Sequence, residues 1–337
     1  MLVYLGIDWS EQKHDCVFQN EKGEQILYVR IEHTLEGFLK LDQVREQLGL
    51  SVAECVIGVE TSHNLLVDFL WSRGYEQVYV LPPKQVQRSQ GRRRQSGARN
   101  DRGDADLIAE IVRTDRHRLY PWHPGTPLLQ EMRAQLGSVR FLTQEIVRLN
   151  NRLRAILLRY YPGILRAFSK LETQIALALI QSYPTPQAAS QMDFAAFQSF
   201  AHQHRYPQPK KLAACYARWQ APYPPATPAI VSAYHTEAVY LANLLLQLIR
   251  LKKQQLSQLE RLYQHHPDRF IFDSLPEAGP LLSAGLLVKF GEDRQRFPSP
   301  NLVQSLAGTC PATQQSGKHK FVYFRRACDQ EFRYLAQ

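Results

Sequence analysis

Short apolar runs separated by turn-forming residues predict a mixed α/β segment at the start of the chain. Runs at residues 2–8, 15–20 and 24–32 are separated by gaps short enough for antiparallel hairpins. A helix capped by Thr34 should extend to about residue 48, with an apolar face made of Leu35, Phe38, Leu39, Leu41, Val44 and Leu48. The other predicted elements are buried strands at 55–60 and 77–83, a helix at 62–73 and a last helix from 101.

A heptad pattern predicts a long coiled-coil helix after a Pro- and Gly-rich linker at 121–127. Its a and d positions are Leu129, Met132, Leu136, Val139, Thr143, Ile146, Asn150, Leu153, Leu157 and Tyr160. This helix can pair between two chains, or it can form an intramolecular hairpin with an apolar helix at 230–264. We expect both, with short proline-broken helices at 162–228 between the two long ones.

The pattern divides the chain into three parts, at residues 1–117, 118–270 and 271–337. The fold class is therefore α/β plus α, with a helical connector and a small, mostly helical C-terminal domain. Within the last part, residues 272–291 resemble a helix-hairpin-helix, whose glycine turn approaches a DNA phosphate, although Glu277 replaces the first glycine. An ordinary helix-turn-helix core explains that segment equally well.

Composition and charge narrow the class of protein. The 337 residues include 41 Lys and Arg and 31 Asp and Glu. The resulting net charge of +10 favours a nucleic-acid partner. The apolar runs are too short to span a membrane, and from the first residues we expect no secretory leader. The odd number of scattered cysteines, without a Cys-x-x-Cys pair, argues against a disulfide framework and a zinc site and suits a cytoplasmic protein.

Four carboxylates fall where the predicted first domain would bring them together. The order β-β-β-α-β-α-β-α is that of a ribonuclease H-like fold, in which Asp8 ends the first strand, Glu60 ends the fourth, and Asp101 and Asp104 begin the last helix. Such a set can hold two Mg²⁺ ions for phosphodiester transfer. Taken singly, each acid is explained better by a strand-ending turn or by a helix N-terminus. Their joint position favours the metal site.

A basic segment precedes the last of these helices. Between residues 84 and 102 the cations are Lys84, Arg88, Arg92, Arg93, Arg94, Arg99 and Arg102, against the single acid Asp101. Such density is typical of a solvated face, a disordered loop or a phosphate-binding track, and the adjacent carboxylates favour the last. The segment has no aromatic residue for stacking on bases, so it should bind backbone rather than sequence.

Three motifs resemble a known family. GIDWS (6–10), VIGVETS (56–62) and ARNDRGDAD (98–106) resemble the RuvC-like domain of the DEDD transposases of bacterial insertion sequences, the bridge-RNA-guided recombinases related to Piv invertases. The resemblance implies that Asp8, Glu60, Asp101 and Asp104 coordinate Mg²⁺. Asp106 lies outside this set, because it is five residues beyond Asp101 and leaves the shared helix face.

Residues 295–335 resemble the C-terminal transposase domain of the same family. The resemblance implies that Ser316, followed by Gly317, is the nucleophile, and that the basic residues Lys318, Lys320, Arg325 and Arg326 bind nucleic acid. Family members usually continue for several more helices, so we expect this chain to be shortened after Gln337.

The resemblance implies a bacterial, nucleoid-associated transposase that cuts and rejoins DNA strands. Its expected partners are donor and target double-stranded DNA, a structured guide RNA and further copies of the same chain. Two alternatives remain open. A RuvC-like nuclease or resolvase would use metal-activated water and would not need Ser316. An inactive, shortened relic would bind nucleic acid without cleaving it.

Overall fold

The computed structural model describes residues 2–61, 65–92, 100–317 and 319–337. The chain forms two compact units, Met1–Pro124 and Gly125–Gln337. The division between them lies inside the linker predicted at 121–127. Residues 125–337 belong to one unit, whereas the sequence suggested a further division at 270.

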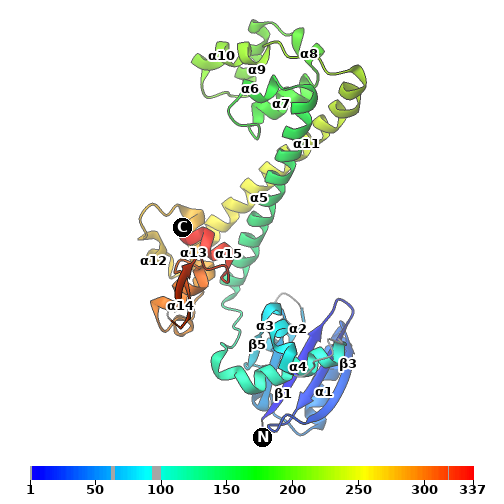
Figure 1. The fold of residues 1–337 in the computed structure, drawn as a ribbon, viewed down its shortest axis with the longest axis vertical. Coiled ribbons are helices and arrows are strands. Elements are labelled where there is room, and N and C mark those ends of the chain that lie inside the picture. The colour runs from blue at the N-terminus through cyan, green and yellow to red at the C-terminus, as the bar shows by residue number, and fades with distance from the viewer. Residues whose placement is uncertain (1, 62–64, 93–99, 318) are drawn as a thin grey trace. The chain divides into compact units, whose positions relative to one another are not determined.

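The first unit contains one five-stranded sheet (Figure 1). Its strands are β1 (Val3–Trp9), β2 (Lys13–Gln19), β3 (Gln25–Glu32), β4 (Cys55–Val59) and β5 (Val78–Val80). They lie side by side in the order β3-β2-β1-β4-β5. The pairs β1–β2 and β2–β3 are antiparallel, whereas β1–β4 and β4–β5 are parallel. The carboxyl ends of β1 and β4 therefore share one edge of the sheet.

Helices cover both faces of this sheet. They are α1 (Leu35–Gln47), α2 (Leu65–Ser72), α3 (Pro83–Ser89) and α4 (Asp101–Asp115), with 3₁₀ turns at Val52–Glu54, Gln90–Arg92 and Arg116–Arg118. The predicted order of strands and helices is confirmed, and α3 is an addition. Thr34 caps α1 as predicted, because its Oγ1 accepts a hydrogen bond from Gly37 N at 3.1 Å. The predicted apolar face of α1 was partly wrong, since Leu35 and Leu39 are exposed.

Two glycines let α4 lie directly on the sheet. A Cβ atom at Gly6 in β1 would be 1.9 Å from the Ala105 carbonyl oxygen and 2.4 Å from Ala109 N, both in the backbone of α4. Its neighbour across the β1–β4 ladder is Gly58, where a Cβ atom would be 2.7 Å from Ile108 Cγ2. Only glycine allows a helix to approach both strands this closely.

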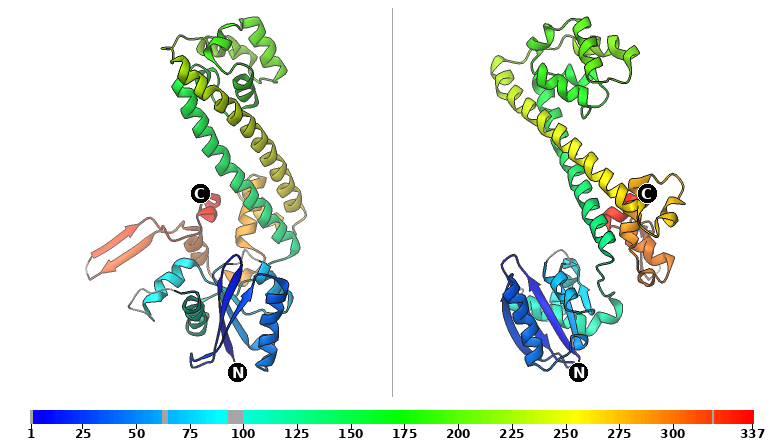
Figure 2. Two further views of the ribbon diagram at one scale, coloured as in Figure 1. Left: turned by 90° about the vertical axis from the view of Figure 1, so that its right-hand side faces the viewer. Right: turned by 180° about the vertical axis from the view of Figure 1, so that it is seen from behind.

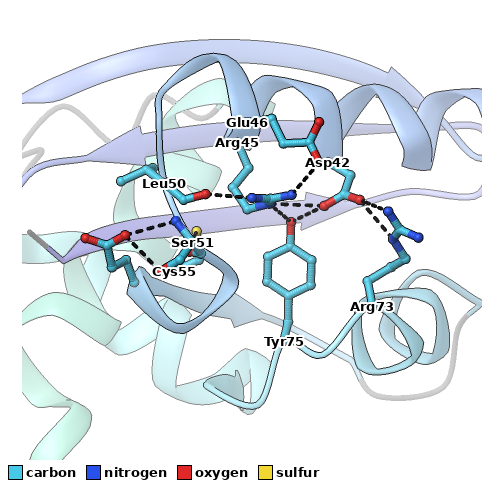
Figure 3. A network of polar contacts seen from close by, with 9 residues as sticks. Asp42, Arg45, Glu46, Leu50, Ser51, Cys55, Arg73 and Tyr75 are labelled. Carbon is cyan, nitrogen blue, oxygen red and sulfur yellow. Dashed lines mark hydrogen bonds and ion pairs between the residues drawn. The ribbon is translucent and has the colours of Figure 1, made fainter.

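A buried polar network fixes the layer formed by α1 and α2 (Figure 3). Asp42 in α1 accepts hydrogen bonds from Tyr75 Oη at 2.7 Å, Arg73 Nη2 at 2.6 Å and Arg45 Nε at 3.1 Å. Burial opposes the charged form of Asp42, but these donors keep its pKa below the usual range. The network joins α1 to the segment after α2 on the face of the sheet opposite α4.

In the second unit, two long helices lie side by side (Figure 2). These are α5 (Pro127–Tyr160) and α11 (Pro228–Gln264), so the predicted intramolecular hairpin is confirmed. Shorter helices connect them: α6 (Ile164–Ala167), α7 (Gln174–Ser182), α8 (Pro186–Ser190), α9 (Phe194–Gln203), the 3₁₀ turn Pro209–Lys211 and α10 (Leu212–Trp219). Most predicted core positions of α5 are buried, but Thr143 and Asn150 are only half-buried. Pairing between chains stays a prediction.

The C-terminal part of this unit is helical with one β-hairpin. Its elements are α12 (Arg269–Asp273), α13 (Pro280–Phe290), the 3₁₀ turn Arg294–Arg296, α14 (Pro300–Ala307), β6 (Ala312–Ser316), β7 (His319–Tyr323) and α15 (Gln330–Ala336). The sequence did not predict the hairpin. Between α12 and α13, Glu277 has φ of 59°, a left-handed conformation that favours glycine. In the described part of the chain, no helix is both long enough and apolar enough to cross a membrane.

Candidate active site

The four predicted carboxylates come from three elements of the first unit. Asp8 lies near the end of β1, and Glu60 directly follows β4, which pairs with β1. Asp101 and Asp104 occupy the first turn of α4, which packs on β1 over Gly6. Strand pairing and helix packing thus bring the backbone of all three elements to one edge of the sheet.

The electrostatics of Asp8 reflect this arrangement. The pKa of Asp8 is raised to about 7, first by burial and then by the neighbouring carboxylates of Glu60, Asp104 and Asp101, in that order of influence. The pKa of Glu60 is also raised, first by burial and then by Asp104. Asp8 is therefore close enough to the other three acids to be repelled by them, and a cation between them would relieve that repulsion.

The donor chemistry fits a divalent metal ion. All four side chains offer carboxylate oxygens, the ligands that hard cations such as Mg²⁺ prefer. Among the described residues, however, no three His, Cys, Asp or Glu side chains are grouped so that they could hold an ion as they stand. Binding by this set therefore requires the carboxylates to move closer together.

The start of α4 is fixed by a cap. Asn100 precedes the helix in an extended conformation, and its side chain accepts a hydrogen bond from Gly103 N at 2.7 Å. The helix consequently begins at Asp101, which places Asp101 and Asp104 one turn apart on the same face.

A buried acid that the sequence did not single out lies beside this site. Asp15 in β2 is the direct partner of Asp8 in the β1–β2 ladder, and its side chain is only 3% exposed. Arg30 in β3 donates to Asp15 Oδ1 from Nε at 3.1 Å and from Nη2 at 2.9 Å, and the Tyr28 hydroxyl also donates to this oxygen. The same Nη2 of Arg30 is 4.0 Å from Asp101 Oδ2. Arg30 thus bridges Asp15 to one of the predicted metal ligands.

Asp106 has a different environment. Gln19 at the end of β2 donates to Asp106 Oδ1 at 2.6 Å and to its carbonyl oxygen at 3.0 Å. The contact ties α4 to β2, which gives Asp106 a structural role.

The basic segment is described only in part. Lys84 and Arg88 are exposed on α3, and Arg92 lies in the following 3₁₀ turn. Arg93, Arg94 and Arg99 lie outside the described residues. Arg102 donates to Gln25 Oε1 at 2.9 Å and its guanidinium lies 4.9 Å from the centre of the Tyr28 ring, so it packs against β3. Lys84 and Arg88 therefore remain the described candidates for backbone binding here.

Ser316 belongs to the second unit, where it is exposed at the end of β6. Gly317 continues into the turn with φ of 56°, which favours glycine. Of the predicted basic residues nearby, Lys320 and Arg326 are exposed, and Lys318 lies outside the described residues. Arg325 instead donates to the carbonyl oxygens of Cys310 and Pro311 at 3.3 and 3.4 Å, which fixes the base of the hairpin.

Comparison with known proteins finds two family models that match separate parts of the chain. A transposase model of the IS110 DEDD type matches residues 5–162, and a model described as the transposase IS116/IS110/IS902 family matches residues 270–335. The chain belongs to this transposase family. The first match contains all four carboxylates, and the second contains Ser316 with its hairpin.

Relatives of the family extend over nearly the whole chain. The mini-circle putative transposase for IS117 of Streptomyces coelicolor is 29% identical over 333 residues, which are 96% of this chain and 79% of that protein. The insertion element IS900 42 kDa protein of Mycobacterium paratuberculosis is 26% identical, over 94% of this chain and 79% of its own length. The IS116 44.8 kDa protein of Streptomyces clavuligerus is 25% identical over 96% and 79%. The prediction of an insertion-sequence transposase is therefore confirmed, and a DEDD transposase implies a divalent metal.

Because the pKa of Asp8 is raised, the free energy of unfolding of the metal-free transposase should depend on pH. An aspartate in an unfolded chain has a pKa near 4, and that of Asp8 in the folded chain is about 7. Stability from this group is therefore present below about pH 4 and is lost as the pH rises to 7. Asp8→Asn should raise the free energy of unfolding in EDTA by about 1–2 kcal/mol at pH 8, after allowance for solvent screening, and by much less at pH 4.

Urea denaturation at both pH values measures this difference. A loss of stability at pH 8 in EDTA would mean that a partner already neutralises the Asp8 carboxylate, which contradicts the arrangement described here.

Proposed function

We propose that this transposase cuts and rejoins DNA strands with a ribonuclease H-like carboxylate site and a serine nucleophile. The observation that carries the proposal is the convergence at one edge of the sheet of β1, β4 and α4, the elements next to or in which Asp8, Glu60, Asp101 and Asp104 lie. Repulsion by the other three acids adds to burial in raising the pKa of Asp8. This arrangement is costly in a folded protein unless a cation offsets it. The strand order β3-β2-β1-β4-β5 supports the ribonuclease H-like assignment.

The four carboxylates would hold Mg²⁺, which when bound supplies Lewis acidity at the reacting phosphodiester. Arg30 would keep the Asp101 carboxylate near the site while its other contact neutralises Asp15. Ser316 Oγ, from another protomer, would form a bond to the phosphorus while the P–O bond to the leaving strand breaks. The hydroxyl proton passes to solvent, the freed strand oxygen takes up a proton, and the retained strand is left as a phosphodiester of the serine. The bond energy is conserved, so the broken strand can be rejoined to a new partner.

Nucleic-acid binding would rest on the exposed cations. Lys84 and Arg88 on α3 and Lys320 and Arg326 near the hairpin carry positive charge into solvent, and the chain has a net charge of +10. These groups suit backbone contacts with donor and target DNA and with a structured guide RNA that supplies base pairing. We propose that this guide is a bridge RNA.

Replacing the serine separates this mechanism from hydrolysis. With guide RNA and Mg²⁺, the protein on labelled DNA carrying donor and target sites should form a DNA-linked species that survives denaturation. Ser316→Ala should lose that species, and Ser305→Ala, which removes a hydroxyl from α14, should keep it. Asp104→Ala should abolish cleavage with RNA binding retained.

Strand cleavage and joining at the normal rate by Ser316→Ala would replace the serine mechanism with metal-activated water. Nucleic-acid binding by the unaltered protein with no cleavage at all would identify an inactive relic.

We also propose that the protein acts as a homo-oligomer through the long helices. Leu136 and Leu153, at predicted heptad positions, are buried within the chain's own helical hairpin, so they are not free to pair with a second chain. Val147 and Leu158 are exposed on α5, and their separation of eleven residues places them on one face three turns apart. Apolar side chains exposed along a helix in this way are typical of association surfaces.

Val147→Lys together with Leu158→Lys should therefore shift the protein to monomers in sedimentation velocity, with its helical content and melting temperature unchanged. The matched control Arg148→Lys together with Arg159→Lys should not alter the sedimentation. An oligomer unaffected by the Val147 and Leu158 changes would rule out this face.

A further inference from the structure

The β6–β7 hairpin carries an unusual concentration of exposed apolar side chains. Phe321, Val322, Tyr323 and Phe324 follow one another, and Phe321 and Tyr323 are 64% and 51% exposed. Every described residue from Thr313 to Phe324 is exposed, and in Figure 2 the hairpin extends away from the C-terminal helices. A run of exposed apolar residues on an isolated two-stranded hairpin indicates a binding surface.

The strand register places the aromatic rings on the same face as Ser316. Ser316 pairs with His319, and Gln314 pairs with Phe321. Because side chains alternate along a strand, His319, Phe321 and Tyr323 share the face of Ser316, whereas Val322 points to the other. The nearly parallel rings of His319 and Phe321, 6.5 Å apart with an interplanar angle of 14°, agree with this assignment.

The charge around the hairpin identifies the occupant as a polyanion. No acidic residue occurs in the sequence between Asp293 and Asp329. Lys320, on the Val322 face of the hairpin, and Arg326, just beyond β7, are both exposed. Phosphates of a nucleic acid match these cations, and the flat rings match the faces of bases. Base faces are hidden inside a duplex, so stacking requires an unpaired strand.

We propose that the Ser316 face of the β6–β7 hairpin binds an unpaired DNA strand by stacking Phe321 and Tyr323 on its bases next to the phosphate that is cut. The choice of DNA rests on the proposed function, because the nucleophilic serine shares this face. Phe321 and Tyr323 are two residues apart along β7, which separates them by roughly 6.6 Å. That spacing leaves room for one base between the two rings, because stacked aromatic faces lie about 3.4 Å apart.

The test measures affinity without reaction. Fluorescence anisotropy in EDTA, with the full chain, gives Kd values for a single-stranded oligonucleotide and for its duplex. Phe321→Ala and Tyr323→Ala should each weaken single-strand binding by about tenfold and change duplex binding by less than twofold. Tyr323→Phe should retain normal affinity, because the ring is kept. Val322→Ala, which removes an equally exposed side chain from the opposite face, should leave both Kd values unchanged.

Unaltered single-strand affinity in Phe321→Ala and Tyr323→Ala would overturn the proposal, as would an equal loss in Val322→Ala. A change of oligomeric state in Phe321→Ala, with DNA binding retained, would assign the face to a second protein chain and would also overturn it. Ser316→Ala should bind the oligonucleotide normally. Loss of the covalent adduct in Ser316→Ala therefore tests the serine nucleophile alone, and loss of single-strand affinity in Phe321→Ala and Tyr323→Ala tests the stacking proposal alone. Failure of one proposal can thus be distinguished from failure of the other.

Discussion

The close approach of α4 to the sheet is the constraint on which the carboxylate site depends. Asp8 and Glu60 are placed by two paired strands, but Asp101 and Asp104 reach them only because α4 lies almost on the backbone of β1. Gly6 and Gly58, neighbours across the β1–β4 ladder, remove the side chains that would hold the helix away. Gly6 and Gly58, which have no functional side chain, thus determine whether the four acids come close enough to act together.

Bringing acids together has an electrostatic cost, and the surrounding residues offset it at some of the acids but not at others. Burial and then the neighbouring carboxylates raise the pKa of Asp8 to about 7, whereas Asp15 accepts hydrogen bonds from Arg30 and Tyr28 directly alongside. This second acid therefore does not need a metal. Arg30 also lies 4.0 Å from Asp101, whereas repulsion by neighbouring acids adds to burial at Asp8 and Glu60, where a bound cation would relieve it.

Much of the first unit was predictable from sequence because its elements have clear periodicity and caps. The order of strands and helices, the Thr34 cap and the elements that carry the four carboxylates were all predicted correctly. The pattern could not show that Leu35 is exposed, since that depends on which turns of α1 the sheet covers. It also could not single out Asp15, whose importance comes from its register against Asp8. The β6–β7 hairpin was missed because its polar first strand shows no apolar alternation.

The number and affinity of Mn²⁺ ions bound by Gly6→Ala test the central claim most directly. Titration followed by electron paramagnetic resonance would compare this variant with the unaltered protein and with Gly91→Ala, a control at a position where an added Cβ meets nothing within 4 Å. If α4 must lie on the sheet for the four carboxylates to act together, Gly6→Ala should lose at least tenfold in Mn²⁺ affinity although every acid is retained, and Gly91→Ala should bind normally. Normal Mn²⁺ binding by a folded Gly6→Ala protein would contradict the account.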